Sequence, residues 1–259
     1  MNRNNILVTG GAGFVGSHLV DALIADGHRV RILDSLVDQV HRGRVPDHIN
    51  ADAEFIRGDV SDRSAVASAL KDVEVVFHQA AEVGVAQSMY EITRYVSAND
   101  LGTAVLLEEM VKLRGQFRKL VVASSMSIYG EGAYSCTGCA DLQFPTLRPN
   151  SQLEQHRWEP VCDVCGGELS PAGTPESKPL HPTSVYAVTK QDQEQYSLIV
   201  GRAYGIPTVA LRYFNVYGER QALSNPYTGV CAIFSARLLN DNPPIIFEDG
   251  GQSRDFVHV

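Results

Sequence analysis

The chain has 259 residues, 44% of them hydrophobic, so it is long enough for one large α/β domain or two small ones and is not a disordered chain. Lys and Arg number 22 against 30 Asp and Glu, and the resulting net charge of −8 disfavours nucleic-acid binding. No apolar run approaches the ~20 residues that a membrane span needs, and a strand-like run stands where a signal peptide would begin. We therefore expect a cytoplasmic protein that binds neither nucleic acid nor membrane.

Short apolar segments alternate with helix-like segments along most of the chain. Strands are predicted at residues 4–9, 29–33, 54–57, 74–77, 119–123 and 207–212, with helices between them, the longest at 92–113 and 184–204. Such alternation predicts βαβ units and a doubly wound parallel sheet that is covered on both faces. Towards the C-terminus, a helix is predicted at 230–240 and a strand at 244–247.

The turn after the first strand carries Gly10, Gly13 and Gly16 in a G-x-x-G-x-x-G spacing, directly before a helix. Glycines let the backbone turn tightly and approach a pyrophosphate, while the helix N-terminus offers N–H groups to the phosphates. Asp34 ends the second strand, where a carboxylate accepts hydrogen bonds from both ribose hydroxyls and repels a 2′-phosphate. The pattern therefore predicts NAD rather than NADP, with a ligand-free glycine turn as the alternative.

Two further positions follow strands of the predicted sheet. Asp59 comes after the third strand, where its carboxylate is expected either to bond the adenine edge or to cap the next helix. Ala80 and Ala81 come after the fourth strand, and such small residues let a cofactor lie flat on the backbone.

Tyr186 and Lys190 are four residues apart and therefore share one face of a predicted helix. A nearby ammonium group and the positive nicotinamide of NAD⁺ both favour the phenolate form of tyrosine, which is a base. Taken alone, this pair is common and carries no information about function. Behind the glycine turn, and with Ser124 and Ser125 at the end of the fifth strand, it predicts a catalytic site.

Seven segments stand in one order along nearly the whole chain, at residues 9–19, 58–60, 77–81, 124–130, 186–190, 212–218 and 254–259. Together they resemble the extended short-chain dehydrogenase/reductases of the nucleotide-sugar epimerase/dehydratase family. The resemblance implies that Tyr186 is the catalytic base and acid, that Lys190 modulates it, and that Ser125 bonds the reacting sugar hydroxyl, with Ser124 as the second choice. It also implies a nucleotide-diphosphate sugar as substrate and a homodimer formed through the two long helices.

The binding residues follow from the glycine turn, the strand ends and the resemblance together. The predicted NAD contacts are Gly10, Gly13, Phe14, Val15, Gly16, Asp34, Ser35, Asp59, Val60, Ala80, Ala81, Asn99, Ser124, Tyr186, Lys190, Tyr213 and Val216. The predicted substrate contacts are Val83, Ser125, Met126, Ser127, Asn215 and Arg254. Among these, the resemblance gives Asn215 and Arg254 to the substrate diphosphate, a role that suits the planar fork of arginine.

The residues after Ser125 bear on the type of reaction. Dehydratases of the family carry an acid there, whereas this chain has Met126 and Ser127, so epimerisation through a transient 4-keto sugar with tightly bound NAD is favoured. Residues 124–129 and 224–229, together with a cysteine-rich insertion, resemble a subgroup that acts on dTDP-L-rhamnose. The alternatives are a UDP-glucose or UDP-glucuronate 4-epimerase, an NAD(H)-dependent 4-ketosugar reductase, and a non-catalytic NAD-binding scaffold.

Four cysteines lie between the fifth strand and Tyr186. Cys136 and Cys139 form one C-x₂-C pair, and Cys162 and Cys165 form a second, 22 residues later. This spacing is typical of a Cys₄ zinc ribbon, so we predict a structural zinc ion, with a pair of disulfides as the alternative. Four thiolates leave no open coordination position, which argues against catalytic zinc. Cys231 is expected to be a small core residue.

These observations predict an α/β protein with a Rossmann-type doubly wound parallel sheet. Residues 1–131 and 182–219 are expected to form the NAD-binding domain, and residues 132–181 a zinc-ribbon-like insertion. Residues 220–259 are expected to begin a small substrate-binding domain, which we expect to be incomplete because the sequence ends inside the last family segment.

Overall fold

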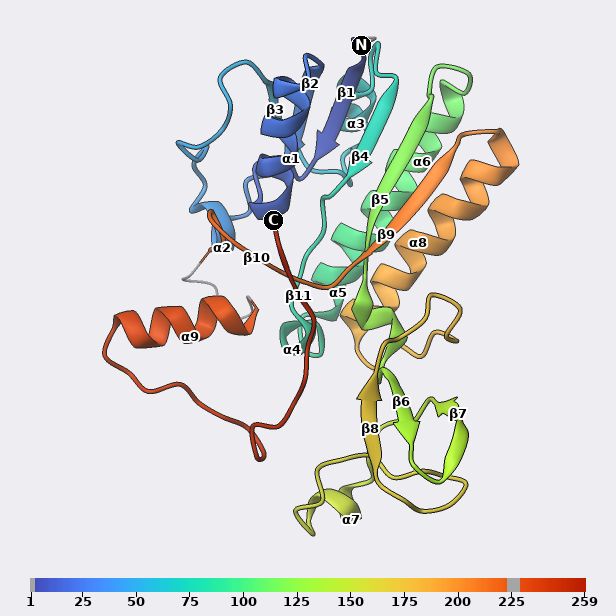
Figure 1. Ribbon diagram of the computed structural model, residues 1–259. Helices are drawn as coiled ribbons and strands as arrows, with labels where there is room; N and C mark the ends of the chain where they lie inside the picture. Colours follow the sequence, from blue (N-terminus) through green and yellow to red (C-terminus); the bar gives the residue numbers. More distant parts are fainter. Residues whose placement is uncertain (1–2, 223–228) are drawn as a thin grey trace.

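The computed structural model describes residues 3–222 and 229–259 and is built around one six-stranded parallel sheet (Figure 1). The strands run in the order β3-β2-β1-β4-β5-β9. Their bounds are β1 (Asn5–Thr9), β2 (Arg29–Asp34), β3 (Glu54–Arg57), β4 (Val75–His78), β5 (Lys119–Ser125) and β9 (Thr208–Tyr213). The strand order reverses between β1 and β4, which is where doubly wound sheets open a crevice at the carboxyl ends of their strands. The predicted α/β fold is confirmed.

Alternate residues of the strands pack into two separate cores, one on each face of the sheet. Leu7 of β1 lies in the core beneath α3 (Arg63–Ala69) and α6 (Gly102–Lys112). Its neighbours Ile6 and Val8 lie in the opposite core, against α1 (Phe14–Ala25). Because side chains alternate across a strand, a central parallel strand must be apolar throughout, as β1 is.

The helix predicted at 92–113 is interrupted by a π turn. It consists of α5 (Ile92–Tyr95), a π-helical segment η1 (Val96–Leu101) and α6. The catalytic helix predicted at 184–204 is observed as α8 (Val185–Tyr204), and the hydroxyl of Ser184 caps its N-terminus by accepting from the Ala187 N–H. Shorter helices are α2 (Asp38–His41), α4 (Val85–Ser88) and the 3₁₀ turn η2 (Met126–Tyr129).

The cysteine-rich segment forms a small antiparallel sheet in the order β7-β6-β8. Its strands are β6 (Ala133–Cys136), β7 (Cys139–Gln143) and β8 (Leu169–Ala172), and it also contains the short helix α7 (Asn150–Leu153). Figure 1 shows this sheet beyond the carboxyl end of β5. The cysteine-rich segment is therefore structured by its own small sheet, which is separate from the central one.

The C-terminal segment returns to the edge of the site. Here β11 (Phe256–His258) pairs in parallel with β10 (Asn215–Tyr217), after the predicted helix, which is α9 (Val230–Leu239). The strand predicted at 244–247 is wrong, because this segment is irregular and its Phe247 is 76% exposed. Two prolines, Pro243 and Pro244, remove N–H donors there, and no described strand pairs with it. Residues 224–228 of the subgroup motif lie outside the described residues.

Within residues 3–222 and 229–259, the helices lack the combined length and hydrophobicity that crossing a bilayer requires.

Candidate active site

A cavity of about 800 Å³ opens at the carboxyl ends of the central strands. Every predicted cofactor residue except Asn99 and every predicted substrate residue except Arg254 lines it. The cavity therefore joins the glycine turn after β1 to Ser125 at the end of β5 and to Tyr186 and Lys190 on α8, although these residues lie far apart in the sequence.

The two exceptions have other contacts. The buried Asn99 side chain accepts from the Glu82 N–H and donates to Glu82 O and to Thr189 Oγ1, at 2.8, 3.1 and 2.9 Å. Through these hydrogen bonds, Asn99 links the loop after β4 to α8, which is a structural role. Arg254 is exposed, and its guanidinium donates to the carbonyl of Ser253 at 2.7 Å.

The glycine turn approaches its neighbours too closely for side chains. Gly10 has φ of +69°, and a Cβ built on it would lie 2.7 Å from the backbone nitrogen of Ala80. A Cβ on Gly16 would lie 2.2 Å from the Gly10 carbonyl oxygen. At the N-terminus of α1, the N-cap residue Gly13 provides no side-chain cap. The first N–H groups of the helix are thus left to an anion, as a pyrophosphate requires.

Asp34 is buried beneath the turn and held by two backbone groups. Its Oδ2 accepts from the Ala12 N–H at 3.0 Å and its Oδ1 accepts from the Leu36 N–H at 2.9 Å. Each carboxylate oxygen keeps a second lone pair for a ribose hydroxyl. His41 Nε2 lies 4.0 Å from Oδ1, and burial lowers the pKa of this imidazole although Asp34 opposes the shift.

Asp59 lines the cavity, but its carboxylate is engaged locally. Its Oδ1 accepts from both the N–H and the hydroxyl of Ser61, at 2.8 and 2.7 Å. The cap of α3 is Asp62 instead, which accepts from the Ser64 N–H at 2.8 Å. The predicted alternative of a helix cap at Asp59 is therefore wrong, because the cap position lies three residues later, at Asp62.

Tyr186, Ser125 and Lys190, the predicted catalytic residues, line the cavity together. Burial raises the pKa of Tyr186, and the hydrogen bond with Ser125 lowers it in part. Burial also lowers the pKa of Lys190 to about 7. In this buried site, the phenol of Tyr186 and the amine of Lys190 therefore both favour their neutral forms.

The two neighbouring serines differ in their contacts. The Ser125 hydroxyl accepts from the Ser127 N–H at 3.1 Å and lies near enough to Tyr186 to lower the pKa of its phenol. Ser124 is also buried, and its hydroxyl has no hydrogen-bond partner within the described parts of the chain. The geometry supports Ser125 as the residue that works with Tyr186.

Two cavity residues, His48 and Arg220, were not predicted from the sequence. Arg220 Nη2 lies 2.8 Å from Asp21 Oδ2, whereas its buried Nη1 has no partner among the described residues. His48 bonds the backbone of Ala12, and its buried Nε2 is likewise without a partner in residues 3–222 and 229–259. The unpaired guanidinium nitrogen of Arg220, in the same cavity as the phosphate-binding turn, fits an anionic group of the cofactor. No spacing in the sequence signals them, since they come from a loop and from the segment after β10.

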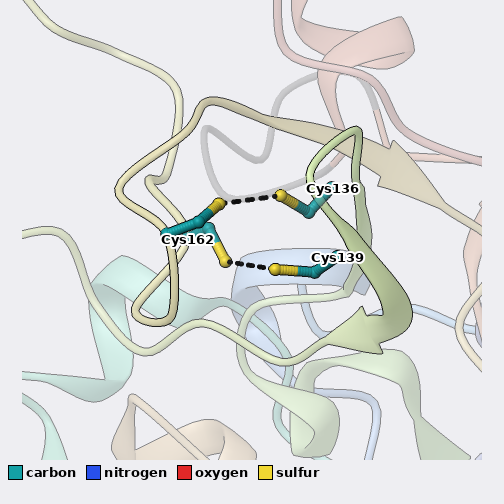
Figure 2. A group of neighbouring side chains, drawn as sticks. Cys136, Cys139 and Cys162 are labelled. Atoms are coloured by element: carbon teal, nitrogen blue, oxygen red, sulfur yellow. Dashed lines mark hydrogen bonds between the residues drawn. The ribbon is translucent and has the colours of Figure 1, made fainter.

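The four cysteines of the insertion converge (Figure 2), and their Sγ atoms all lie within 4.8 Å of one another. The sulfurs of Cys136 and Cys165 are 3.4 Å apart, and those of Cys139 and Cys162 are 3.7 Å apart. Zn–S bonds of about 2.3 Å in a tetrahedron place sulfurs about 3.8 Å apart, so the four thiols fit a zinc ion. All four are free and too far apart for disulfides.

One member of the second cysteine pair, Cys162, favours the thiolate form. Backbone N–H groups of Cys165 and Val164 lower the pKa of the Cys162 thiol to about 7. Only glycine fits at Gly138 without crowding, because a Cβ there would lie 3.3 Å from the Cys165 sulfur. These are the features of a metal-binding knuckle.

A sequence model of the NAD dependent epimerase/dehydratase family matches residues 6–152 and 164–259. The dTDP-L-rhamnose 4-epimerase of Burkholderia thailandensis is 37% identical over 263 residues, which cover 100% of this chain and 70% of that protein. The UDP-glucose 4-epimerase of Thermotoga maritima, solved with UDP-glucose, has a TM-score of 0.76 and 34% identity over 98% of this chain and 69% of its own. The UDP-glucuronic acid 4-epimerase of Bacillus cereus, solved with UDP-glucuronic acid and NAD, has a TM-score of 0.76 and 29% identity over the same shares, 98% and 69%. By sequence, fold and site, the chain belongs to the NAD dependent epimerase/dehydratase family.

Proposed function

We propose that the chain is a nucleotide-sugar 4-epimerase that works with tightly bound NAD, and that its substrate is dTDP-L-rhamnose. The observation that carries the proposal is that Ser125, Tyr186 and Lys190 line one cavity together with the glycine turn. Similarity to the Burkholderia thailandensis enzyme supports the choice of sugar.

The residues of the cavity fit NAD. The uncapped N-terminus of α1 faces the pyrophosphate, and Asp34 offers its remaining lone pairs to the adenosine ribose. Bound NAD supplies a hydride acceptor that takes the C4 hydrogen of the sugar and returns it. The loop around Ala80 and Ala81, whose side chains are small, lets the cofactor lie close to the sheet edge.

Tyr186 and Ser125 handle the proton of the sugar 4-hydroxyl. In the phenolate form, Tyr186 removes this proton while the Ser125 hydroxyl bonds the same oxygen, and Lys190 stabilises the negative phenolate. The sugar ring then presents its other face, and Tyr186 returns the proton to the oxygen of the 4-keto sugar. A hydride returned to the opposite face inverts C4 with no net oxidation, so the reaction is an isomerisation.

The side chains after Ser125 favour epimerisation over loss of water. Neither Met126 nor Ser127 can act as the carboxylic acid that a dehydration needs. Glu82 lines the cavity, but Arg94 binds its carboxylate at 2.9 Å. The salt bridge with Arg94 thus already occupies the Glu82 carboxylate.

The cavity supports a 6-deoxy sugar rather than a uronate. Val83, Val85 and Met126 line it and offer an apolar wall, which suits the methyl group of a 6-deoxy sugar better than a uronate carboxylate. UDP-glucose and UDP-glucuronate remain the competing substrates, in keeping with the solved relatives.

The remaining assignments are proposed with the same function. We propose a structural zinc ion bound by the four cysteines of the insertion, Cys136, Cys139, Cys162 and Cys165. We also propose that residues 1–131 and 182–219 form the NAD-binding domain and that residues 132–181 form the insertion. The substrate-binding domain starts in this scheme at residues 220–259. In this scheme, neither Asn99 nor Arg254 takes part in the reaction itself. We also propose a cytoplasmic homodimer formed through α5, η1 and α8, which present apolar side chains such as Ile92, Val96, Leu101, Val188 and Ile199 to solvent.

Proton NMR tests the function directly. The protein is incubated separately with dTDP-L-rhamnose, UDP-glucose and UDP-glucuronate, and Tyr186→Phe serves as the control. We expect a C4 epimer of dTDP-L-rhamnose that does not form with the variant. Oxidation of added NADH by a 4-keto sugar, without epimerisation, would indicate a reductase. Bound NAD with no turnover of any donor would indicate a scaffold.

A further inference from the structure

A buried hydrogen-bond network leads from Lys190 into the core of the sheet. Lys190 Nζ donates to Gln193 Oε1 at 2.7 Å, and Gln193 Nε2 donates to Thr103 Oγ1 at 2.8 Å. Thr103 Oγ1 and Gln193 Nε2 also lie 2.9 and 3.2 Å from His78 Nε2. On the other side of its ring, His78 Nδ1 lies 2.7 Å from Thr9 Oγ1. Lys190 is 3% exposed and Gln193 is 1% exposed, so the network lies in the interior of the protein.

The chemistry of these groups fixes the direction of the Gln193 amide. An ammonium group only donates, so it requires the carbonyl oxygen of Gln193 and not the amide nitrogen. The amide nitrogen then donates to Thr103, whose hydroxyl donates to His78 Nε2. This leaves the His78 proton on Nδ1, where it is donated to Thr9. Burial lowers the pKa of His78 to about 3, so its ring remains neutral and keeps this arrangement.

We propose that Gln193 is a positioning residue, whose Oε1 holds the Lys190 amine as the ammonium ion on the helix face that carries Tyr186. The inference rests on the proposed function for its catalytic consequence, but the contact itself does not depend on the substrate. Burial favours the neutral amine, and within the described chain Gln193 Oε1 is the acceptor that the structure gives to Nζ. Without that acceptor the phenolate of Tyr186 would lose its positive neighbour near neutral pH.

Other titratable groups near Lys190 do not replace Gln193. Tyr186 lies one turn away on α8, His78 comes from β4, and Tyr213 of β9 lines the same cavity. The polar side chains that α6 and β5 contribute to the network and the cavity all end in hydroxyl groups, those of Thr103, Ser124 and Ser125. None of these side chains is a carboxylate, so the neutral acceptor Gln193 determines the charge of the amine.

The test is an NMR titration of the lysine side chains in the purified protein, which has only five lysines. The Lys190 signal is assigned by its loss in Lys190→Met. We expect Gln193→Leu to lower the titration midpoint of Lys190 by about one pH unit, because a hydrogen bond to the charged form is lost. Gln193→Glu should raise it by a similar amount, since an anionic acceptor favours the ammonium ion. Gln191→Leu, on the same helix, is the matched control and should leave the midpoint unchanged.

Equal midpoints in wild type and both Gln193 variants, or shifts in the same direction, would overturn the proposal. If Gln193 had only a structural role, its variants would change the thermal stability but would not shift the titration midpoint of Lys190 in opposite directions. Should Gln193→Leu fail to fold, Gln193→Glu keeps the test, because it preserves the length and the acceptor oxygen. On dTDP-L-rhamnose, we expect the alkaline limit of kcat in Gln193→Leu to move to lower pH with KM unchanged. Shifted midpoints without epimerase activity in wild type would reject the proposed function and leave this inference standing.

Discussion

The Arg212 guanidinium binds both oxygens of the Glu194 carboxylate, at 2.7 and 3.1 Å, and so joins β9 to the catalytic helix α8. It also donates to the Tyr129 hydroxyl at 2.8 Å and to the carbonyl of Glu176 at 3.1 Å. One side chain thus connects the catalytic helix, the last strand of the sheet, the turn after Ser125 and the end of the insertion.

We predict that Arg212→Met destabilises the fold. The Glu194 side chain is buried, and removing one partner of a buried pair costs about 3 kcal/mol, which corresponds to roughly 6–12 °C in Tm for a chain of this size. Arg212→Lys keeps the charge but loses the two-pronged geometry, so its Tm should lie between those of the other two proteins. Differential scanning calorimetry checks the order, and a Tm of Arg212→Met equal to wild type would contradict it.

A second prediction concerns cofactor binding by Arg220. Because its Nη1 is buried beside the glycine turn without a partner in the described chain, Arg220→Met should raise the Kd for NAD about tenfold or more. Adenosine lacks the pyrophosphate, so its Kd should not change. Isothermal titration calorimetry with both ligands separates the two cases. Equal weakening of both ligands would show instead that the variant disturbs the pocket as a whole.

Tyr186→Phe removes the proton carrier and keeps the ring. We expect kcat for epimerisation to fall about 10²–10⁴-fold, the usual contribution of a general acid–base group, while the Kd for NAD stays the same. Steady-state kinetics and calorimetry measure the two quantities. A variant that retained wild-type kcat would exclude Tyr186 as the base.

The zinc prediction is tested by metal analysis. The purified protein should hold one zinc ion per chain, and Cys162→Ser should lose it together with thermal stability, because the metal supplies order that this small sheet lacks. Cys231→Ser is the matched control, since Cys231 lies outside the cluster, and should keep the ion.

We further expect loss of zinc to alter sugar selectivity, because the insertion lies beyond the carboxyl end of β5 (Figure 1). Unchanged selectivity in the zinc-free variant would separate the insertion from the sugar pocket.

Asp100 gives a prediction about pH. Burial, aided by the neighbouring Asp192, raises the pKa of Asp100 to about 6 from its usual value near 3.8. Between these values the folded chain binds more protons than the unfolded one, so stability falls as pH rises from about 4 to 6 and then levels off. Asp100→Asn should remove this slope and be more stable than wild type above pH 6. Denaturant unfolding at several pH values measures the slope, with the exposed Asp52→Asn as control, and an unchanged slope in Asp100→Asn would refute the assignment.

Local patterns predicted most of the central fold. The strand before Gly10, the turn itself and the 184–204 helix follow from apolar periodicity, glycine spacing and a serine cap, which depend on neighbouring residues only. The strand predicted at 244–247 failed because apolar residues alone do not make a strand, and that segment has no partner to pair with. The π turn at Val96–Leu101 was also missed, since its place depends on Asn99 reaching Glu82 and Thr189.

By itself, the sequence determined the class of fold, the glycine turn, the Tyr186–Lys190 pair and the cysteine spacing, because each depends on residues at short, fixed separations. Only the tertiary structure decided which side chains complete the site. Arg220 and His48 meet the phosphate-binding turn, and Gln193 meets His78 and Thr103, through contacts that span many residues of chain. Such contacts exist only after the parallel strands bring their carboxyl ends to one edge of the sheet, and burial there lowers the pKa of Lys190.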